Sequence, residues 1–551
     1  MPFVAFFLLL LCCLVTGYGL ITLFGLQLRT AYMITLSLLL GVAVASFLPF
    51  LLQLLYIQLT AVTVFASLLA TALAFNIPTL RLIRKEGWAN VRRTFDFKPV
   101  RILPYEIPYF LIFGFIVFVS IWRCYYLPPT SRDALSGPEA IAEFAVREHT
   151  MINSFFSVDL WSTNNQFKSP FLISLQMICK MAGFPFGQVW LSVVFVSFTV
   201  FLYHALKEKI HPIIAGLLLL LFLMTPEMYA YTFMVLYDYS NMIFFFLSLY
   251  FLFGYFSQRP PAGLPTPAGL PTPAGLLTPD SLPTPAGHRS PGGLYFSGLL
   301  MGIATYIRSE TLILAFLFLP PILLVQFRQK DAFKKMIRAD VLFILPSLIA
   351  YYLTTQLYIK YYLPVNYDIG GLINNHLGDL HPLFQRYSDI VTHLIGSEFG
   401  IHLWGYIFYV TAFLFLAEGV FRRRYSKEAR NWLYAILVLY IGLGALGFAL
   451  PMMNLNETTK RAMFKMLPLL LLYLANNRLL IALSEKISRW ENAKPVAAAA
   501  TASKSATAKP APASGKFAPA QGKPASSAGQ PKSASGKPTA TSKKKRPPRG
   551  R

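Results

Sequence analysis

Charged residues are rare in the long apolar stretches of this chain, and several of them stand where an apolar segment begins or ends. Asp133 follows the apolar segment 108–127, Asp238 opens a later one, and Arg308 with Glu310 separates two short ones. A carboxylate in such dry surroundings can act as a general base or a cation ligand. A guanidinium at the same depth is suited to bidentate binding of phosphate. These residues predict acid–base chemistry and anion binding at the edge of a membrane.

Each of these residues also has a purely structural interpretation. Asp133 would cap the helix expected over residues 134–148, a position that aspartate favours. Asp238 would be an interfacial helix cap. Arg308 would extend to the membrane surface or pair with Glu310. These interpretations stay open beside the functional ones.

Two further groups of charges invite the same comparison. Lys460 and Arg461 open the last apolar segment, where Arg461 would hold a phosphate, extend to the interface or pair with Glu457. Glu139 lies in a polar segment where Glu143 and Arg147 follow at helical spacing, which is also typical of a solvated interfacial helix. The histidines of loop 363–401 lack the spacing of any known metal-ligand motif, so the sequence names no metal site and leaves a divalent cation requirement open.

The composition predicts an all-α polytopic membrane protein. Of 551 residues, 55% are hydrophobic and only 13% are charged, so the apolar surface exceeds what one soluble core could bury. The formal charge of +25 is local, because the segment from Leu483 onward holds 15 Lys or Arg against two acids and so supplies 13 of it. A nucleic-acid partner is therefore not expected. The apolar run over residues 1–24 has no basic leader and no cleavage site, and we expect a retained helix.

About thirteen segments approach the length that crosses a bilayer. They cover residues 3–24, 31–55, 57–77, 106–127, 186–206, 212–231, 239–257, 294–307, 310–327, 340–360, 400–421, 432–451 and 462–482. Two of them, 294–307 and 310–327, are short and predict half-helices that meet at a polar break. Basic segments at Arg81–Arg101, Arg328–Arg338 and Arg422–Arg430 are expected on the cytoplasmic side. This orientation puts the N-terminus outside, the C-terminus in the cytoplasm and every candidate site residue on the outer face.

Two segments of low complexity are expected to build no core. Residues 258–293 contain repeats of Leu-Pro-Thr-Pro-Ala-Gly and predict a cytoplasmic linker. Residues 483–551 are rich in Ala, Lys and Pro and predict a disordered basic tail. Because each basic residue near an anionic membrane contributes about 1 kcal/mol, we expect the tail to bind anionic lipid.

An ordered series of motifs runs through the centre of the chain. Between Pro108 and Phe256 it comprises an apolar span, Asp133, the turn Lys168-Ser169-Pro170-Phe171-Leu172 opening an amphipathic helix that ends at Gly183-Phe184, a basic turn at Lys207–Lys209, Met224-Thr225-Pro226 and Asp238. Ala304-Thr305-Tyr306-Ile307-Arg308-Ser309-Glu310 and Lys460-Arg461-Ala462-Met463 follow. This series resembles the GT-C membrane glycosyltransferases that use polyprenyl-phosphate-linked sugars, the class of protein O-mannosyltransferases and lipid A aminoarabinose transferases.

The resemblance implies a domain plan and a set of site residues. Residues 1–104 would be an N-terminal three-helix membrane appendage with a basic cytoplasmic loop, and 105–482 a GT-C-like core. Asp133 and Asp238 would be the catalytic residues. The substrate-binding residues would be Lys168, Glu139, Arg308, Glu310, Lys460 and Arg461.

The chain departs from that class at two motifs. Arg132-Asp133-Ala134 stands where the class carries a paired Asp-Glu, so Glu139 or Glu143 would have to supply a second carboxylate. Lys168-Ser169-Pro170 stands where the class carries Lys-Pro-Pro.

The expected function is transfer of a sugar from a polyprenyl-phosphate donor to a glycan, lipid or protein acceptor on the outer, periplasmic face of a bacterial inner membrane. A flippase or exporter of lipid-linked sugars is the alternative from another class, although no inverted repeat is visible. A family member without activity is the third interpretation, which the missing second carboxylate leaves open. The identity of the sugar and of the acceptor does not follow from the sequence.

Overall fold

The fold was obtained as a computed structural model of the chain. The described residues are 2–26, 28–86, 102–157, 168–257, 292–328, 333–363, 381–396, 398–422, 425–449 and 460–491. The described residues all lie within one compact unit, Met1–Glu491. The expected linker lies outside the described residues except for Gly292 and Gly293, which begin a helix. The expected tail also lies outside them, except that residues 483–491 belong to the helix Arg478–Glu491.

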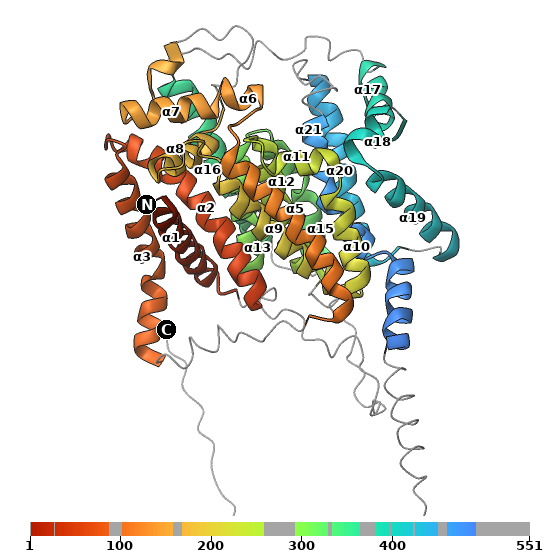
Figure 1. Ribbon diagram of the computed structural model, residues 1–551. Helices are drawn as coiled ribbons and strands as arrows, with labels where there is room; N and C mark the ends of the chain where they lie inside the picture. Colours follow the sequence, from red (N-terminus) through yellow and green to blue (C-terminus); the bar gives the residue numbers. More distant parts are fainter. Residues whose placement is uncertain are drawn as a thin grey trace, which may run out of the picture. The chain divides into compact units, whose positions relative to one another are not determined.

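The described residues form helices and no strand (Figure 1). The helices are α1 Pro2–Leu23, α2 Thr30–Leu54, α3 Ala61–Glu86, α5 Ile107–Tyr126, α6 Arg132–Leu135, α7 Pro138–Glu148, α8 Phe171–Met181, α9 Trp190–Lys207, α10 Pro212–Leu223, α11 Pro226–Tyr231, α12 Tyr237–Ser257, α13 Gly292–Ile307, α14 Thr311–Leu317, α15 Leu319–Arg328, α16 Phe333–Tyr351, a π-helix Tyr352–Tyr362, α17 His381–Val391, α18 Glu398–Trp404, α19 Ile407–Arg422, α20 Lys427–Ala449, α21 Lys460–Met463 and α22 Met466–Ala475. Proline occupies the first turn of α5, α7, α10 and α11, where its fixed φ suits a helix and its missing N–H is not needed.

Eight described helices are long and apolar enough to cross a membrane, and a ninth crossing is formed if Arg461–Ala475 and Arg478–Glu491, bent by 54°, count as one span. The all-α polytopic membrane class predicted from composition is confirmed at this level. Several expected spans are shorter or broken in the structure. The segment 212–231 ends at Leu223 and resumes as α11, and 400–421 is divided between α18 and α19 at Gly405.

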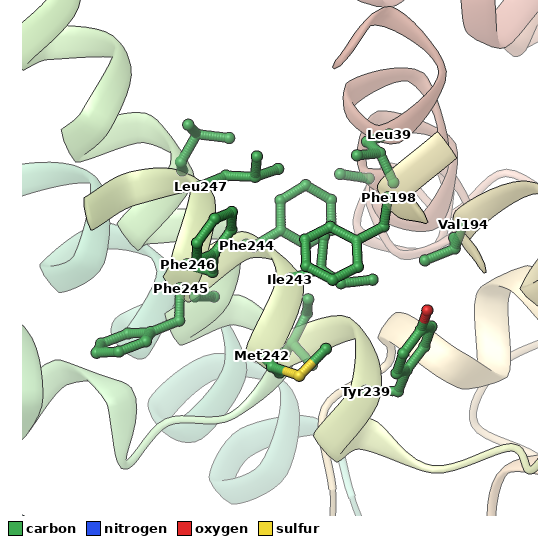
Figure 2. Packing of buried hydrophobic residues seen from close by; sticks show 14 of the residues in the cluster. Leu39, Val194, Phe198, Tyr239, Met242, Ile243, Phe244, Phe245, Phe246 and Leu247 are labelled. Carbon is green, nitrogen blue, oxygen red and sulfur yellow. The ribbon is translucent and has the colours of Figure 1, made fainter. Parts of the chain in front are cut away.

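Helix α12 forms the centre of the core. It is apolar on all sides, as expected for a helix that other helices surround, and most of its length is buried. Figure 2 shows Phe244 to Leu247 of α12 beside Phe198 of α9 and Leu39 of α2. The rings of Phe198 and Phe246 meet edge to face with centroids 5.6 Å apart.

The N-terminal helices pack closely on one another and on the core. A Cβ added at Gly17 of α1 would lie 1.9 Å from the backbone oxygen of Ser37, and one at Gly41 of α2 would lie 2.0 Å from that of Cys13. Small residues let helix backbones approach in this way. Helix α2 then packs on α8 and α9, where Tyr32 meets Phe201 at 5.0 Å.

The expected polar break between two short helices is confirmed. Helix α13 ends at Ile307, and α14 begins at Thr311. Asn241 of α12 bridges the break, because its Nδ2 donates to the Ala304 oxygen at 2.6 Å and to Thr311 Oγ1 at 3.0 Å. Freed backbone groups are tolerated at such depth when neighbouring helices satisfy them.

Candidate functional site

Asp133 lies in α6, the short helix that follows α5. Ser131 caps this helix, since its Oγ accepts a hydrogen bond from the Ala134 N–H at 3.1 Å. The single capped helix expected here is therefore wrong in detail: Ser131 is the cap, and the helix is divided at Gly137 into α6 and α7. The Asp133 carboxylate instead accepts a hydrogen bond from Arg461 Nη1 and forms an ion pair with it.

Asp238 lies in the first turn of α12 and is 3% exposed. Arg308, directly after α13, donates from Nη1 to Asp238 Oδ1. The same guanidinium approaches Glu310, with Nε 2.5 Å from Oε1 but without hydrogen-bond alignment. Burial disfavours the charge of Arg308, but Asp238 and Glu310 outweigh it and raise the pKa of that guanidinium above its ordinary value. The pairing with Glu310 considered from the sequence is confirmed, and Asp238 is added to it.

Lys168 lies in the turn before α8. Its Nζ stands over the ring of Tyr237, 5.8 Å from the centroid, and the Tyr237 hydroxyl donates to the Ser169 carbonyl at 2.8 Å. Burial first, and then repulsion from Arg308, lower the pKa of Lys168 to about 8. The first residue of α12 thus fixes the turn that carries this lysine. The helix that follows is not the amphipathic one expected, because every side chain from Phe171 to Cys179 is buried.

The two ion pairs belong to one cluster. Lys168 interacts electrostatically with the charged groups of both pairs, namely Asp133, Arg461, Asp238 and Arg308. These groups come from the ends of different helices, and Figure 1 shows α6 and α21 at the same end of the helical bundle. These five residues therefore lie together at one end of the helices.

Lys465, directly before α22, is a member of the cluster that sequence reasoning missed. It is 1% exposed, and it interacts electrostatically with Glu310, Arg308 and Asp238. The cluster thus contains three carboxylates, Asp133, Asp238 and Glu310, and four cations, Lys168, Arg308, Arg461 and Lys465. A signal was present in the sequence, because Lys465 follows Arg461 at i+4 and so shares its helical face.

Glu139 contacts side chains of α8. Its carboxylate lies 2.7 Å from Lys180 Nζ and accepts a hydrogen bond from Gln176 Nε2. Lys180 also pairs with Glu143, with Nζ 3.0 Å from Oε2. The hydrogen bond from Lys180 lowers the pKa of Glu143, because its effect outweighs that of burial, which would raise it. The contacts dock α7 onto α8, so neither glutamate takes the place of a second catalytic carboxylate beside Asp133 in the described part of the chain.

Two of the sequence-based predictions fall wholly or partly outside the described residues. Lys460 begins α21, but its side chain is not described. Of the histidine loop, residues 364–380 are not described. Within the described ranges, no group of three or more His, Cys, Asp or Glu side chains could hold a metal ion.

The chemistry that the cluster supports combines a base with anion binding. Asp133 is 22% exposed as a side chain and therefore reachable, whereas Asp238 is enclosed. Buried cations attract a negatively charged group strongly, because little water screens them. The chain matches no protein-family model, and comparison with the curated proteins and with the solved structures finds no similar one.

Proposed function

We propose that this chain is a membrane glycosyltransferase that moves a sugar from a polyprenyl-phosphate donor to an acceptor on the outer face of the membrane. Its core would be GT-C-like, within about thirteen spans. The observation that carries the proposal is the charged cluster, in which a reachable carboxylate, Asp133, lies among four cations at the ends of apolar helices. The donor has two parts that suit this arrangement: its lipid tail would contact the apolar helices, and its phosphate would contact the cations of the cluster.

The proposed reaction is a displacement at the anomeric carbon of the sugar. The acceptor hydroxyl oxygen forms a bond to that carbon while the bond from carbon to the phosphate oxygen breaks and leaves its electron pair on the lipid phosphate. Asp133 accepts the hydroxyl proton, as a general base within hydrogen-bond reach can. The neighbouring cations stabilise the negative charge that develops on the leaving phosphate.

The lipid-facing helices support access for such a donor. Helix α5, which leads directly to Asp133, buries little of its length and exposes large apolar side chains such as Leu111, Phe115 and Phe118. Exposed apolar surface on a membrane helix is the surface that contacts hydrocarbon. A lipid carrier that lies along this face would bring its phosphate to the end of α5, where Asp133 stands.

A flippase or exporter is the second candidate, and a specific observation favours it. The chain has a helix break at Arg308 to Glu310 and a 54° bend between Ala475 and Arg478, and transporters bind substrates at broken helices. Against it, the cluster lies at helix ends: Asp133 follows α5, Asp238 is the second residue of α12 and Arg308 follows α13. Transporter sites lie near the middle of the bilayer, so we place the transferase first.

The deciding experiment compares strains that lack the gene or carry it as wild type or Asp133→Asn. Mass spectrometry would measure envelope glycans, glycoproteins and lipid-linked sugars in each strain, with the protein level checked by immunoblot. The transferase predicts that one sugar is lost from its acceptor in both the deletion and the Asp133→Asn strain, and that the lipid-linked sugar accumulates. Accumulation on the inner leaflet alone would favour the flippase. An unchanged profile in the deletion strain would reject both activities.

Orientation is tested separately by labelling single cysteines in intact cells with a membrane-impermeant reagent. Leu135 and Lys427 are both exposed, and they belong to α6 and to the start of α20. A cysteine in place of Leu135 should be labelled from outside, and one in place of Lys427 should be labelled only after the cells are opened. The reverse pattern would place the cluster on the cytoplasmic side and would contradict transfer to an acceptor on the outer face.

A further inference from the structure

The four cations of the cluster differ in how their charges are used. Arg461 donates to Asp133, and Arg308 holds both Asp238 and Glu310. Lys168 stands over the ring of Tyr237. Lys465 is the most enclosed of the four, and its Nζ has no hydrogen-bond partner among the described residues.

An enclosed ammonium without a partner is costly. It has three N–H groups that would bond to water in the unfolded chain, and burial removes that water without replacing it. Glu310 and Asp238 lie close enough to interact with Lys465 electrostatically, but Arg308 already holds both carboxylates. The position directly before the first turn of α22 adds to the cost, because the positive end of a helix dipole disfavours a cation and favours an anion.

We propose that the Lys465 ammonium is the primary contact for the phosphate of the ligand, and that Arg308 and Arg461 position carboxylates instead. The assignment deepens the proposed function and rests on it for the identity of the lipid. Phosphate oxygens at Lys465 would accept hydrogen bonds from its N–H groups, and no ion pair of the protein would have to break. A phosphate bound by Arg308 or Arg461 would have to compete with Asp238 or Asp133 for the guanidinium, and displacing Asp238 would leave a buried carboxylate without this partner.

The roles expected from the sequence are thereby redistributed. Both arginines were expected to hold the phosphate, because a guanidinium at the end of a span suits that ligand. The structure shows their nitrogen atoms facing carboxylates of the protein. The competing explanation is that Lys465 only balances the negative charges of Glu310 and Asp238. In that case its removal would change stability but would not change any preference for phosphate.

The experiment measures lipid binding by the purified full-length protein in detergent. The probes are decaprenyl phosphate, the neutral alcohol decaprenol and inorganic phosphate. The wild type should bind decaprenyl phosphate at least tenfold more tightly than decaprenol. Lys465→Met, which removes the charge at similar length, should reduce that ratio to about one. Lys180→Met is the matched control, because Lys180 is also enclosed but pairs with Glu139 and Glu143, and it should retain the wild-type ratio.

The remaining outcomes separate the alternatives. A Lys465→Met protein that keeps the tenfold preference overturns the proposal. If this variant does not fold, Lys465→Gln, which keeps hydrogen-bond donors without charge, is measured in the same way, and an unchanged preference again overturns it. Inorganic phosphate that competes with decaprenyl phosphate only in proteins with Lys465 supports the site, and competition at equal affinity would identify free phosphate as its ligand.

The outcome is distinguishable from failure of the proposed function. Sugar transfer by the wild type together with a phosphate preference independent of Lys465 would overturn this assignment alone. A Lys465-dependent preference for decaprenyl phosphate in a protein whose deletion leaves every envelope sugar unchanged would retain the phosphate site and reject the transferase.

Discussion

Arg461 and Asp133 lie 328 positions apart in the chain, and their side chains form an ion pair. This contact joins the polar loop after α5 to the start of the last apolar helices. It brings a candidate base to a guanidinium and uses the charge of one to hold the other. Removal of either residue therefore has two effects, one on chemistry and one on the position of its partner.

The first prediction concerns Asp133. Asp133→Asn keeps the shape of the side chain but removes its basicity, so the rate of sugar transfer with bound donor should fall by about 10²-fold or more. The binding of decaprenyl phosphate should change little. Single-turnover kinetics with saturating lipid-linked sugar measures the step, and Ser136→Ala, at the residue that follows α6, is the control. Wild-type transfer by the Asn variant would leave Asp133 as a structural partner of Arg461.

The second prediction concerns the enclosed pair of Asp238 and Arg308. Breaking such a pair by removing one charge costs about 3–5 kcal/mol, because the remaining charge is buried alone. Asp238→Asn should therefore lower the melting temperature of the purified protein. The double variant Asp238→Asn with Arg308→Met should melt at a higher temperature than Arg308→Met alone, because Arg308→Met leaves both Asp238 and Glu310 without their cation and the double variant leaves only Glu310 so. Additive losses in the double variant would contradict a direct interaction.

The third prediction is a pH dependence to which Lys168 contributes beside Lys465, the other buried lysine of the cluster. Because the pKa of Lys168 is lowered to about 8, its ammonium is charged below that pH and becomes neutral above it. A group that must be charged to attract a phosphate loses that interaction as the pH rises. Above its pKa, the affinity falls by at most roughly tenfold per pH unit. The affinity for decaprenyl phosphate should therefore fall between pH 7 and 9.

The matched variant for this dependence is Lys168→Arg. A guanidinium stays charged throughout this range, so the fall in affinity should be smaller than in the wild type. Isothermal titration at several pH values measures both proteins. Identical profiles would assign the pH dependence to another group of the cluster.

The fourth prediction concerns Glu418, a fully buried carboxylate of α19 at the bend of the last helices. It accepts hydrogen bonds from Asn477 Nδ2 at 2.8 Å and from the Arg478 N–H at 3.1 Å. Glu418→Ala removes the acceptor of both bonds, leaves Asn477 Nδ2 with the Leu414 oxygen alone, and should destabilise the protein by about 2–4 kcal/mol. Glu485→Ala is the control, because Glu485 is exposed and its carboxylate pairs with Arg489 one turn further along the same helix. Equal melting temperatures for the two variants would show that the bend does not depend on Glu418.

The fifth prediction concerns the close approach of α1 and α2. Gly41→Ala places a Cβ 2.0 Å from the Cys13 oxygen, so the two helices must separate and the protein should lose stability. Gly114→Ala is the matched control in α5, where the added Cβ meets nothing within 4 Å. Thermal unfolding should show a loss for Gly41→Ala and none for Gly114→Ala. The opposite ranking would mean that α1 is not packed on α2 in the membrane.

The sequence alone was sufficient to predict the class of the protein and the positions of its long helices. Continuous apolar runs must form helices in a membrane, since only internal hydrogen bonds satisfy the backbone there. The short helices α13 and α14 were expected for the same reason, as the charges of Arg308 and Glu310 interrupt the apolar run. Asp133, Asp238, Arg308 and Arg461 were expected on one face, because the basic loops set the orientation of the spans and the order of the spans then brings these segment ends to the same side.

The partners of these side chains required the tertiary structure. Nothing in the sequence near Arg461 indicates that Asp133 is its counterion, because an apolar helix packs against neighbours through shape and carries little local signal of which helix that neighbour is. For the same reason Glu139 was assigned to the site, although Lys180 of α8 holds it. Lys465 was not singled out from the sequence, and only the packing of the helices around it shows that it is enclosed and that its Nζ meets no hydrogen-bond partner in the described part of the chain.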